Sequence, residues 1–483
     1  MYPDSTHDTT TRRRLLLLVS DGVRPDVMRD EMDGGRAPTL SALRDRGGFH
    51  AVTSSFPSVT GPAYVPFLMG RHPARVGLPG LRWYDRARTL AWSRQQSRSY
   101  AGVDIWHVDR DIHRDSPTLL ELATPSLAGM CMLARGATHG RIGRSVYWMC
   151  RAAPAHFRGD LLGWRRVEQE ASARFLERFA RVRPRFSVLA LTSPDKFAHK
   201  FGSDAPEVRA AIGDLDRIAA RARALAQRDG WLDDLHIWVV GDHGHAPVSH
   251  HDDLHGWLER EGLRVLAHPQ LGTRRADVAL MVGGNAMAHL YFAPHERQRS
   301  WWPALAPRWS TIVDRVLERE SIDLVMLARS ASEVEVRHAT RGRAVVRIHE
   351  HNSATRWSYT LETGDPLQLG GSHENLNLDD AWTVTADSPY PDALVQLSYL
   401  AVSARAGDCI VSAAEAWDLR ARFEPVDHVS THGALLRDQM LVPLLTDTPP
   451  AQLPQRTTDV VPSVMQLLGV TADIPIDGRS FLR

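Results

Sequence analysis

The sequence is poor in cysteine and lysine and has no long apolar run. Cys131, Cys150 and Cys409 are its only cysteines in 483 residues, too widely spaced for a disulfide framework or a cysteine-based zinc site. A reducing compartment suits such a chain, and we expect a cytoplasmic location. The run from Leu15 to Val19 is shorter than the roughly 7–15 apolar residues of a signal-peptide core and the roughly 18–20 of a membrane span. We therefore expect a buried strand there and no membrane partner.

The sequence also lacks an excess of charge of either sign. The formal net charge is +1, so no field of the whole chain favours a nucleic acid duplex. Only two of the 58 basic residues are lysine, Lys196 and Lys200. Both lie in SPDKFAHKFG (193–202), which indicates a need for lysine in that segment.

Short apolar runs and long amphipathic segments alternate along the chain. Runs of buried-strand length are LLLLVSDG (15–22), FSVLALTSPD (186–195) and LHIWVVGDHG (235–244). Helical spacing of apolar residues is found in 167–182 and 207–231. This alternation predicts an α/β fold with a mostly parallel central sheet flanked by helices.

The middle of the chain has a different pattern. Residues 333–363 alternate apolar and polar side chains around two turns, which predicts an antiparallel meander. We expect residues 1–11 to be disordered, 12–270 to form the first part of the core, 271–424 to be an inserted α+β cap, and 425–483 to return to the core. Trp301, Trp302, Trp357 and Tyr359 lie in the cap, where one of them could stack on a base, although aromatic side chains are more often core.

Carboxylates and imidazoles follow the predicted strands. In open α/β sheets ligands bind beyond the carboxyl ends of the strands. The carboxylates and imidazoles together form a donor set suited to zinc or manganese. Two such ions could hold the attacking and leaving oxygens of a displacement at phosphorus. The residues at these positions are Asp21, Asp195 with His199, Asp242 with His243, and His432 with His428 before it.

A hydroxyl-rich stretch is the candidate source of a nucleophile. TSSFPSVTG (53–61) holds five hydroxyl side chains. An ordinary hydroxyl is a weak nucleophile at neutral pH, and a metal ion is an efficient way to activate it. The stretch alone does not say which of the five reacts.

These residues resemble the alkaline phosphatase superfamily, specifically its type I phosphodiesterase/nucleotide pyrophosphatase branch. The resemblance covers roughly 14–270 and 425–483. It rests on VSDGVRPD (19–26), PSVTGPAYVPFLMGRHPARVG (57–77), PDKFAHKFG (194–202), GDHGH (241–245), STHG (430–433) and DGRSF (477–481), in the order of the family.

The resemblance implies two Zn²⁺ ions, with Mn²⁺ as the alternative. By position, Thr60 matches the nucleophile, with Ser58 as its near competitor. The implied ligands of one ion are Asp195, His199 and His432, with His373 as the competitor of His432. Those of the other are Asp21, Asp242, His243 and the Thr60 oxygen.

The resemblance further implies hydrolysis of a small phosphoester, a phosphodiester or nucleotide pyrophosphate, through a phosphothreonine intermediate. Gly61 would donate its amide to a phosphoryl oxygen. Where the family has an asparagine, this chain offers Arg82, a bidentate phosphate binder. Lys196 would reach a substrate phosphate or merely extend from a helix start. A phosphomonoesterase, a phosphotransferase with the same intermediate and an inactive binding protein are the alternatives.

Overall fold

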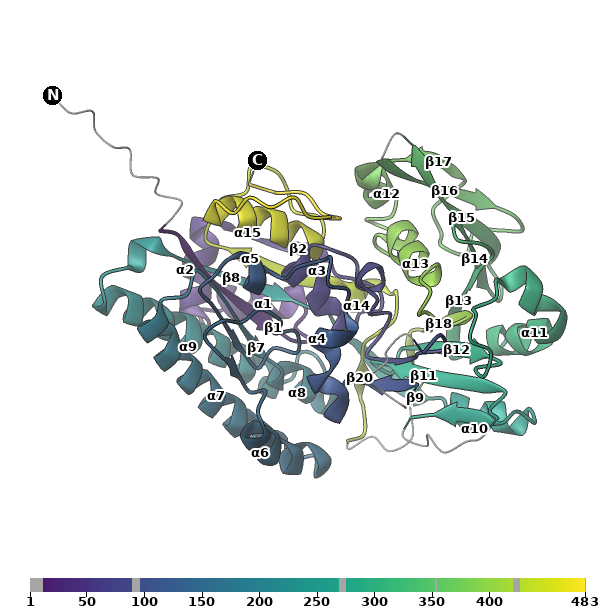
Figure 1. Cartoon of the computed structure of the whole chain (residues 1–483), viewed down its shortest axis with the longest axis horizontal. Helices are drawn as coiled ribbons and strands as arrows, with labels where there is room; N and C mark the ends of the chain where they lie inside the picture. The colour runs from purple at the N-terminus through teal and green to yellow at the C-terminus, as the bar shows by residue number, and fades with distance from the viewer. Residues whose placement is uncertain (1–11, 89–95, 269–274, 352–353, 420–425, 483) are drawn as a thin grey trace.

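The computed structural model describes residues 12–88, 96–268, 275–351, 354–419 and 426–482, so the predicted disordered stretch 1–11 lies outside the described residues. Two large sheets organise the chain, one at the core of each half of the molecule (Figure 1). None of the helices in these ranges has both the length and the apolar character that crossing a membrane requires.

The central sheet is mostly parallel, as the sequence predicts. Strands β8, β1, β7, β5 and β6 pair in parallel, and β21 runs antiparallel between β8 and β2. In spatial order the strands are β2 (Gly48–Thr53), β21 (Leu441–Thr446), β8 (Leu235–Gly241), β1 (Arg14–Ser20), β7 (Phe186–Leu191), β5 (Ser126–Gly129) and β6 (Arg141–Ile142).

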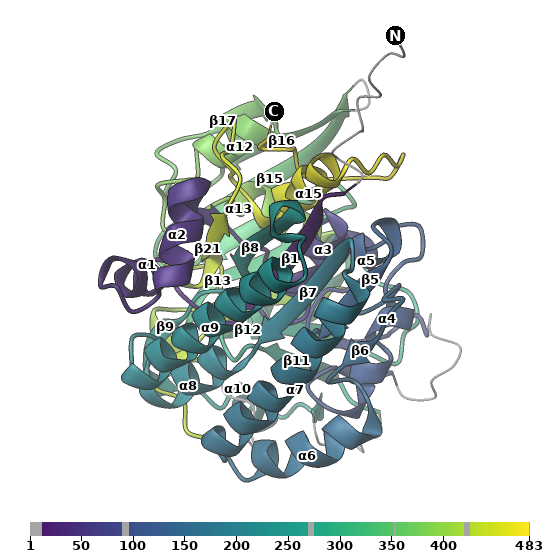
Figure 2. The same ribbon diagram turned by 90° about the vertical axis from the view of Figure 1, so that its left-hand side faces the viewer.

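Strand β1 is buried on both faces, which explains its continuous apolar run. Successive side chains of a strand point to opposite faces. Leu16 and Leu18 pack against α1 (Pro25–Asp33), α2 (Pro38–Arg46), α7 (Leu161–Val182), α8 (Ser193–Phe201) and α9 (Pro206–Arg228). Leu15, Leu17 and Val19 pack with α3 (Val65–Met69), α5 (Leu119–Leu122) and α15 (Val460–Leu468). Figure 2 shows α7 and α9 lying across one face, and these are the two long helices predicted from the sequence.

The second sheet is formed by the middle of the chain. The predicted meander is present as β14 (Glu333–His338), β15 (Gly342–His351) and β16 (Ala354–Leu361), which pair antiparallel. The other strands are β10 (Val265–Ala267), β11 (Val278–Gly283), β12 (Met287–Phe292), β13 (Ile322–Ala328), β17 (His373–Leu376) and β18 (Cys409–Ala413). Helices α11 (Trp302–Leu317) and α13 (Ala393–Ala401) contact this sheet. The cap boundaries 271–424 stay a prediction, and β10 lies before the first of them.

The C-terminal segment returns to the central sheet through β21, in agreement with the sequence analysis. A small third sheet joins the two halves beside the strand ends. It consists of β19 (Ala416–Asp418), β9 (Ala246–His251) and β20 (Ser430–Thr431). The remaining α-helices of the described residues are α4 (Val108–Asp111), α6 (Val146–Phe157), α10 (Leu254–Arg260), α12 (Leu378–Thr383) and α14 (Arg437–Met440).

A buried ion pair ties the C-terminal segment to the second half. Arg456 donates to both carboxylate oxygens of Asp392, at 2.9 and 2.6 Å, and both side chains are almost fully buried. Gln396 also donates to Asp392, at 2.8 Å, and accepts from the amide of Phe56, at 2.9 Å. The pair is thus linked by hydrogen bonds to the hydroxyl-rich stretch.

We expect Arg456→Met to lower the free energy of unfolding by about 3–5 kcal/mol, because it leaves the Asp392 carboxylate buried without its cation. Urea denaturation measures the change. The matched control is Arg479→Met, whose partner Asp379 is exposed, so that the loss stays below about 1 kcal/mol. Equal losses in the two variants would contradict the prediction.

Candidate functional site

Three parallel strands end level at one edge of the central sheet. Ser20 of β1 lies beside Leu191 of β7 and beside Gly241 of β8. Asp21 and Asp242 follow two of these residues directly. Asp195 comes after Leu191, in the first turn of α8, which begins two residues after β7 ends. The shared register therefore brings three carboxylates from distant parts of the chain to one place.

The hydroxyl-rich stretch passes over this edge, and its anchors distinguish Thr60 from Ser58. The Ser58 hydroxyl donates to the carbonyl of Ala434 at 2.9 Å and accepts from the amide of Gly433 at 3.1 Å. Ser58 is fully buried and holds the loop that carries His432. Thr60 Oγ1 instead lies 3.1 Å from Asp21 Oδ1 and 3.0 Å from His243 Nε2.

The first group of polar side chains surrounds Thr60. His243 Nε2 lies 3.4 Å from Asp21 Oδ1 and 3.4 Å from Asp242 Oδ2. Burial and the neighbouring Asp21 raise the pKa of Asp242 well above its ordinary value. Against the effect of burial, Asp242 and Asp21 raise the pKa of His243 to about 10. The two buried carboxyl groups thus favour positive charge at this point of the site.

The second group is centred on Asp195. Its Oδ1 lies 2.9 Å from His245 Nε2, 3.4 Å from His199 Nε2 and 3.5 Å from His432 Nε2. Although burial favours the neutral acid, His199 and the other two imidazoles hold the pKa of Asp195 well below its ordinary value. The two groups adjoin, because the rings of His243 and His432 stack with their centres 3.6 Å apart.

The imidazoles are oriented by backbone carbonyls. The Nδ1 atoms of His199, His432 and His243 donate to the carbonyls of Ser430, Ser58 and Gly244, at 2.9, 2.9 and 3.1 Å. When these imidazoles are neutral, as metal-ligating histidines are, each Nε2 carries a lone pair, which faces the carboxylates. Hydrogen bonds from the far ring nitrogen to a carbonyl are the usual way in which proteins orient metal-ligating histidines.

Facing lone pairs and carboxylates repel one another unless a cation lies between them. The atoms of Asp195, His199, His245 and His432 lie close enough together to bind one ion, and those of Asp21, Asp195 and His243 another. Within the described part of the chain, Asp242 Oδ2 is buried and has no hydrogen-bond partner. The residues present therefore fit divalent cations with oxygen and imidazole ligands.

A family model supports the same conclusion. The model described as type I phosphodiesterase/nucleotide pyrophosphatase matches residues 15–435. The chain belongs to this family. Its members are metal-dependent phosphoric ester hydrolases, and the resemblance seen in the sequence is confirmed.

Relatives of the phosphodiesterase family agree with this assignment. Human ectonucleotide pyrophosphatase/phosphodiesterase family member 7 is 22% identical over 240 residues, 50% of this chain and 49% of that protein. The chain thus spans about half the length of this curated relative. Murine ectonucleotide pyrophosphatase/phosphodiesterase 5 is 14% identical, with a TM-score of 0.56, covering 96% of this chain and 97% of that one. Phosphonoacetate hydrolase from Sinorhizobium meliloti is 15% identical, with a TM-score of 0.54, covering 95% and 96%. These structures confirm the predicted alkaline-phosphatase-like fold.

The seven ligand residues that the resemblance implies lie together in this phosphodiesterase-family chain, and His245 lies beside them. The sequence did not assign His245, because GDHGHAPVSHH (241–251) holds three histidines beyond the expected ligand His243. Its burial depends on the pairing of β9 with β20, where its Nδ1 lies 2.9 Å from Ser430 Oγ. His373, the competitor of His432, lies instead on β17 in the second sheet. His428 stacks on His199, with ring centres 4.1 Å apart.

Tyr64 is a second residue that the sequence did not single out. It lies one turn after Thr60 and donates its hydroxyl to Asp21 Oδ2 at 2.9 Å. The two oxygens of Asp21 thus accept from Tyr64 and from Thr60.

The predicted substrate-binding residues adjoin Thr60. Arg82 and Lys196 line a cavity of about 510 Å³ together with Thr60. Arg82 on β3 (Arg82–Tyr84) donates to the carbonyl of Val282 at 3.2 Å. Lys196 Nζ lies 4.2 Å from the ring centre of Trp164. The position of Gly61 admits only glycine, because its φ is +96° and a Cβ there would lie 2.3 Å from Met132 Sδ. The roles of the three stay predictions.

Glu168 on α7 holds the segment that leads to Asp195. Its carboxyl accepts from the amides of Thr192 and Ser193 at 2.6 and 3.2 Å and contacts the Ser193 hydroxyl. Burial raises the pKa of Glu168 to about 7, although Ser193 and Thr192 oppose the shift. The ordinary value is near 4.5, so the folded chain keeps this proton at pH values where the unfolded chain has lost it.

We expect the free energy of unfolding to fall as the pH rises from about 4.5 to about 7. Below about pH 4.5 the acid is neutral in both states. Above about pH 7 the folded state must bury a charged carboxylate, which lowers the free energy of unfolding by about 3 kcal/mol. Glu168→Gln removes this titration, so the variant gains up to that amount relative to the wild type between pH 4.5 and pH 8. Urea denaturation at both pH values measures it, and parallel pH profiles would contradict it.

Proposed function

We propose that this chain hydrolyses phosphodiesters with Thr60 as the nucleophile. The observation that carries the proposal is the position of Thr60 Oγ1, which lies within 3.1 Å of Asp21 and 3.0 Å of His243 where the two ligand groups meet. A hydroxyl placed among carboxylates and oriented imidazoles is typical of an activated nucleophile. The structure of the murine relative is that of an inactive variant in which alanine replaces a threonine, and this supports the choice.

The first group, with the Thr60 oxygen, and the second group would each hold one ion. Zn²⁺ is our first choice and Mn²⁺ the alternative, because the donors are carboxylates and imidazoles without thiolates. When bound, two such ions would lower the pKa of the attacking hydroxyl and offset the charge that gathers on the phosphoryl oxygens.

The reaction consists of two displacements at phosphorus. Thr60 Oγ1 passes its proton toward Asp21 Oδ1, its acceptor at 3.1 Å, and forms a bond to phosphorus as the bond to the leaving oxygen breaks. Water then attacks the phosphothreonine, the bond between Oγ1 and phosphorus breaks, and Thr60 recovers a proton. Tyr64 keeps Asp21 oriented through its hydrogen bond of 2.9 Å. Arg82 and Lys196 supply positive charge beside the phosphoryl group.

A small phosphoryl compound is the substrate class that the comparisons support. The family description names phosphodiesterase and nucleotide pyrophosphatase, and the murine relative is described in complex with AMP. The relative from Sinorhizobium meliloti is described in complex with phosphonoformate. The cytoplasmic location stays a prediction from the sequence.

The test compares bis-p-nitrophenyl phosphate, thymidine 5′-p-nitrophenyl phosphate and p-nitrophenyl phosphate, together with metal analysis of the purified chain. We expect about two metal ions per chain and higher kcat/KM for the diesters. A chelator should remove the activity, and Zn²⁺ or Mn²⁺ should restore it. Higher kcat/KM for the monoester would assign the chain to the phosphomonoesterases, and a metal-free chain without turnover would overturn the proposal.

A further inference from the structure

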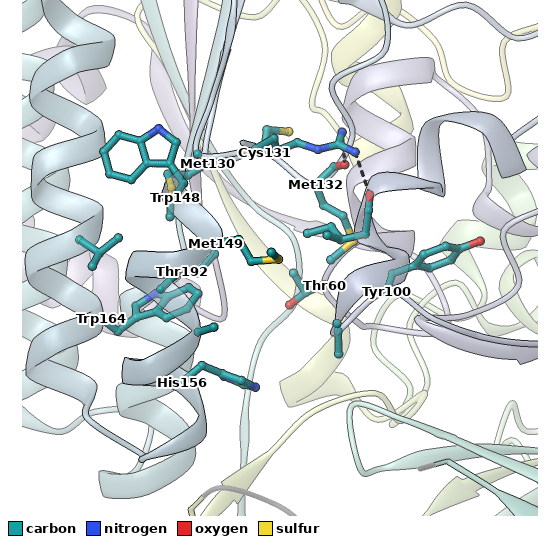
Figure 3. A pocket seen from close by; sticks show the side chains of 18 of the residues that line it. Thr60, Tyr100, Met130, Cys131, Met132, Trp148, Met149, His156, Trp164 and Thr192 are labelled. Atoms are coloured by element: carbon teal, nitrogen blue, oxygen red, sulfur yellow. Dashed lines mark hydrogen bonds between the residues drawn. The ribbon is translucent and has the colours of Figure 1, made fainter. Parts of the chain in front are cut away.

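A second cavity opens from Thr60 in another direction. It has a volume of about 360 Å³ and contacts Asp21, Thr60 and Asp195 at its inner end. Its walls come from three segments: residues 100–106, the loop after β5, and helices α6 and α7. In Figure 3, Met149 and Trp164 lie on the helical side, opposite Thr60 and Tyr100. A group attached to a phosphorus atom at Thr60 can therefore extend into this space.

The wall is apolar and adaptable. Met132 lines it near Thr60, and Met130 lines it beside Trp148 and Met149 of α6. Thioether side chains have three rotatable bonds and adjust to ligands of varied shape. Phe157, also in the lining, is 76% exposed, so the cavity reaches solvent past this side chain. A volume near 360 Å³ lies in the usual range of small-molecule sites, roughly 300–1,000 Å³.

Polar groups on this wall already have partners. Arg144 donates to Asp109 and to the carbonyls of Met132 and Ile105, at 2.7, 2.9 and 2.7 Å. The Tyr100 hydroxyl donates to Asp111 and accepts from Trp83 at 3.1 Å.

Two further groups are engaged in the same way, and Ser145, His156 and Lys196 also border the cavity. The Cys131 thiol donates to the carbonyl of Leu133 at 3.0 Å, and burial raises its pKa to about 12. The Thr192 hydroxyl donates to Glu168 at 3.1 Å and accepts from Trp164 at 2.9 Å. The polar edges of a nucleobase would find these groups occupied and would lose their hydrogen bonds to water without replacement.

The cavity of about 510 Å³ on the other side of Thr60 is different in character. Arg82 and His268 line it, together with Lys196 and His156, which border both cavities. Burial together with the nearby cations lowers the pKa values of both His156 and His268 to about 4, so the two imidazoles are neutral and the positive charge lies on Arg82 and Lys196. The larger cavity thus adds Arg82 to the Lys196 that both cavities share, whereas the lining of the smaller one is mostly apolar.

We infer that the substrate carries an apolar ester group, an alkyl chain or an aryl ring, seated in the cavity of about 360 Å³. The inference rests on the proposed function, since it names the class of phosphodiester that the site takes. Apolar burial favours such a group, whereas a nucleoside would have to leave its polar atoms unpaired.

The experiment measures binding, not turnover. Methyl-, propyl- and pentylphosphonate and thymidine 5′-phosphate are titrated by calorimetry into the Zn²⁺-loaded chain. We expect the affinity to rise about threefold to fourfold with each added methylene, and pentylphosphonate to bind more tightly than the nucleotide. Ala153→Trp, which places a large ring at the lining, should lower the ratio of pentyl to methyl affinity at least tenfold. Val146→Trp on the same helix, at a position 62% exposed and outside the lining, is the control and should keep the ratio.

Two results would overturn the inference. One is an affinity independent of chain length in the wild type. The other is an equal loss of the ratio in Ala153→Trp and Val146→Trp. Failure of the proposed function is separable, because it would appear as absent diester turnover while the dependence on chain length persists.

Discussion

Thr60→Ala is expected to lower kcat for a p-nitrophenyl phosphodiester by about 10⁴-fold or more, the scale on which loss of a covalent nucleophile acts in other hydrolases. The reason is geometric: Thr60 Oγ1 is the hydroxyl that contacts both Asp21 and His243. Steady-state kinetics measure the loss, with thermal unfolding as the check on folding.

Ser58→Ala is the matched control in the same stretch. The Ser58 hydroxyl bonds to the loop of His432 and not to the carboxylates, so its removal should cost about 1 kcal/mol of stability and change kcat by less than about tenfold. If Ser58→Ala abolished turnover while Thr60→Ala did not, the assignment of the nucleophile would be wrong.

The second large effect is expected for Asp195→Asn. Asp195 Oδ1 is the atom on which three imidazole nitrogens converge, and it belongs to both candidate ligand sets. Losing a residue that only hydrogen-bonds to a metal ligand costs about 10–100-fold in metal affinity. We therefore expect a larger loss of metal affinity when a ligand itself is neutralised. Metal analysis after dialysis should give about one ion per chain in place of two, with turnover lost in parallel.

Asp45→Asn serves as the control for Asp195→Asn, since the Asp45 side chain is 69% exposed and lies on α2. It should keep the full metal content. Undiminished metal binding in Asp195→Asn would show that the second group is not a metal site.

The core of the fold could be predicted because its strands are buried on both faces. Continuous apolar runs such as Leu15 to Val19 distinguish these strands from loops, and a ligand edge follows from a parallel sheet. Asp21 and Asp242 were found because they follow strands directly. His432 follows the two-residue strand β20 and was found by its motif alone.

Thr60 could not be chosen by local sequence. The distinction from Ser58 lies in a tertiary contact with Ala434, which is remote in the chain. The walls of the apolar cavity were missed for a related reason. Trp148 and Met149 lie on a helix where such side chains are usually core, and only the approach of residues 100–106 and 130–132 makes them a lining. Three of the four aromatic candidates of the cap are core instead, since Trp302, Trp357 and Tyr359 are at most 4% exposed, whereas Trp301 is partly exposed.

The stereochemical course at phosphorus tests the central claim most directly. A diester made chiral at phosphorus with sulfur is hydrolysed in ¹⁸O-labelled water, and the configuration of the labelled product is determined. Two successive in-line displacements, first by Thr60 and then by water, predict overall retention. Inversion would mean that water attacks the substrate directly, which would contradict the covalent role of Thr60.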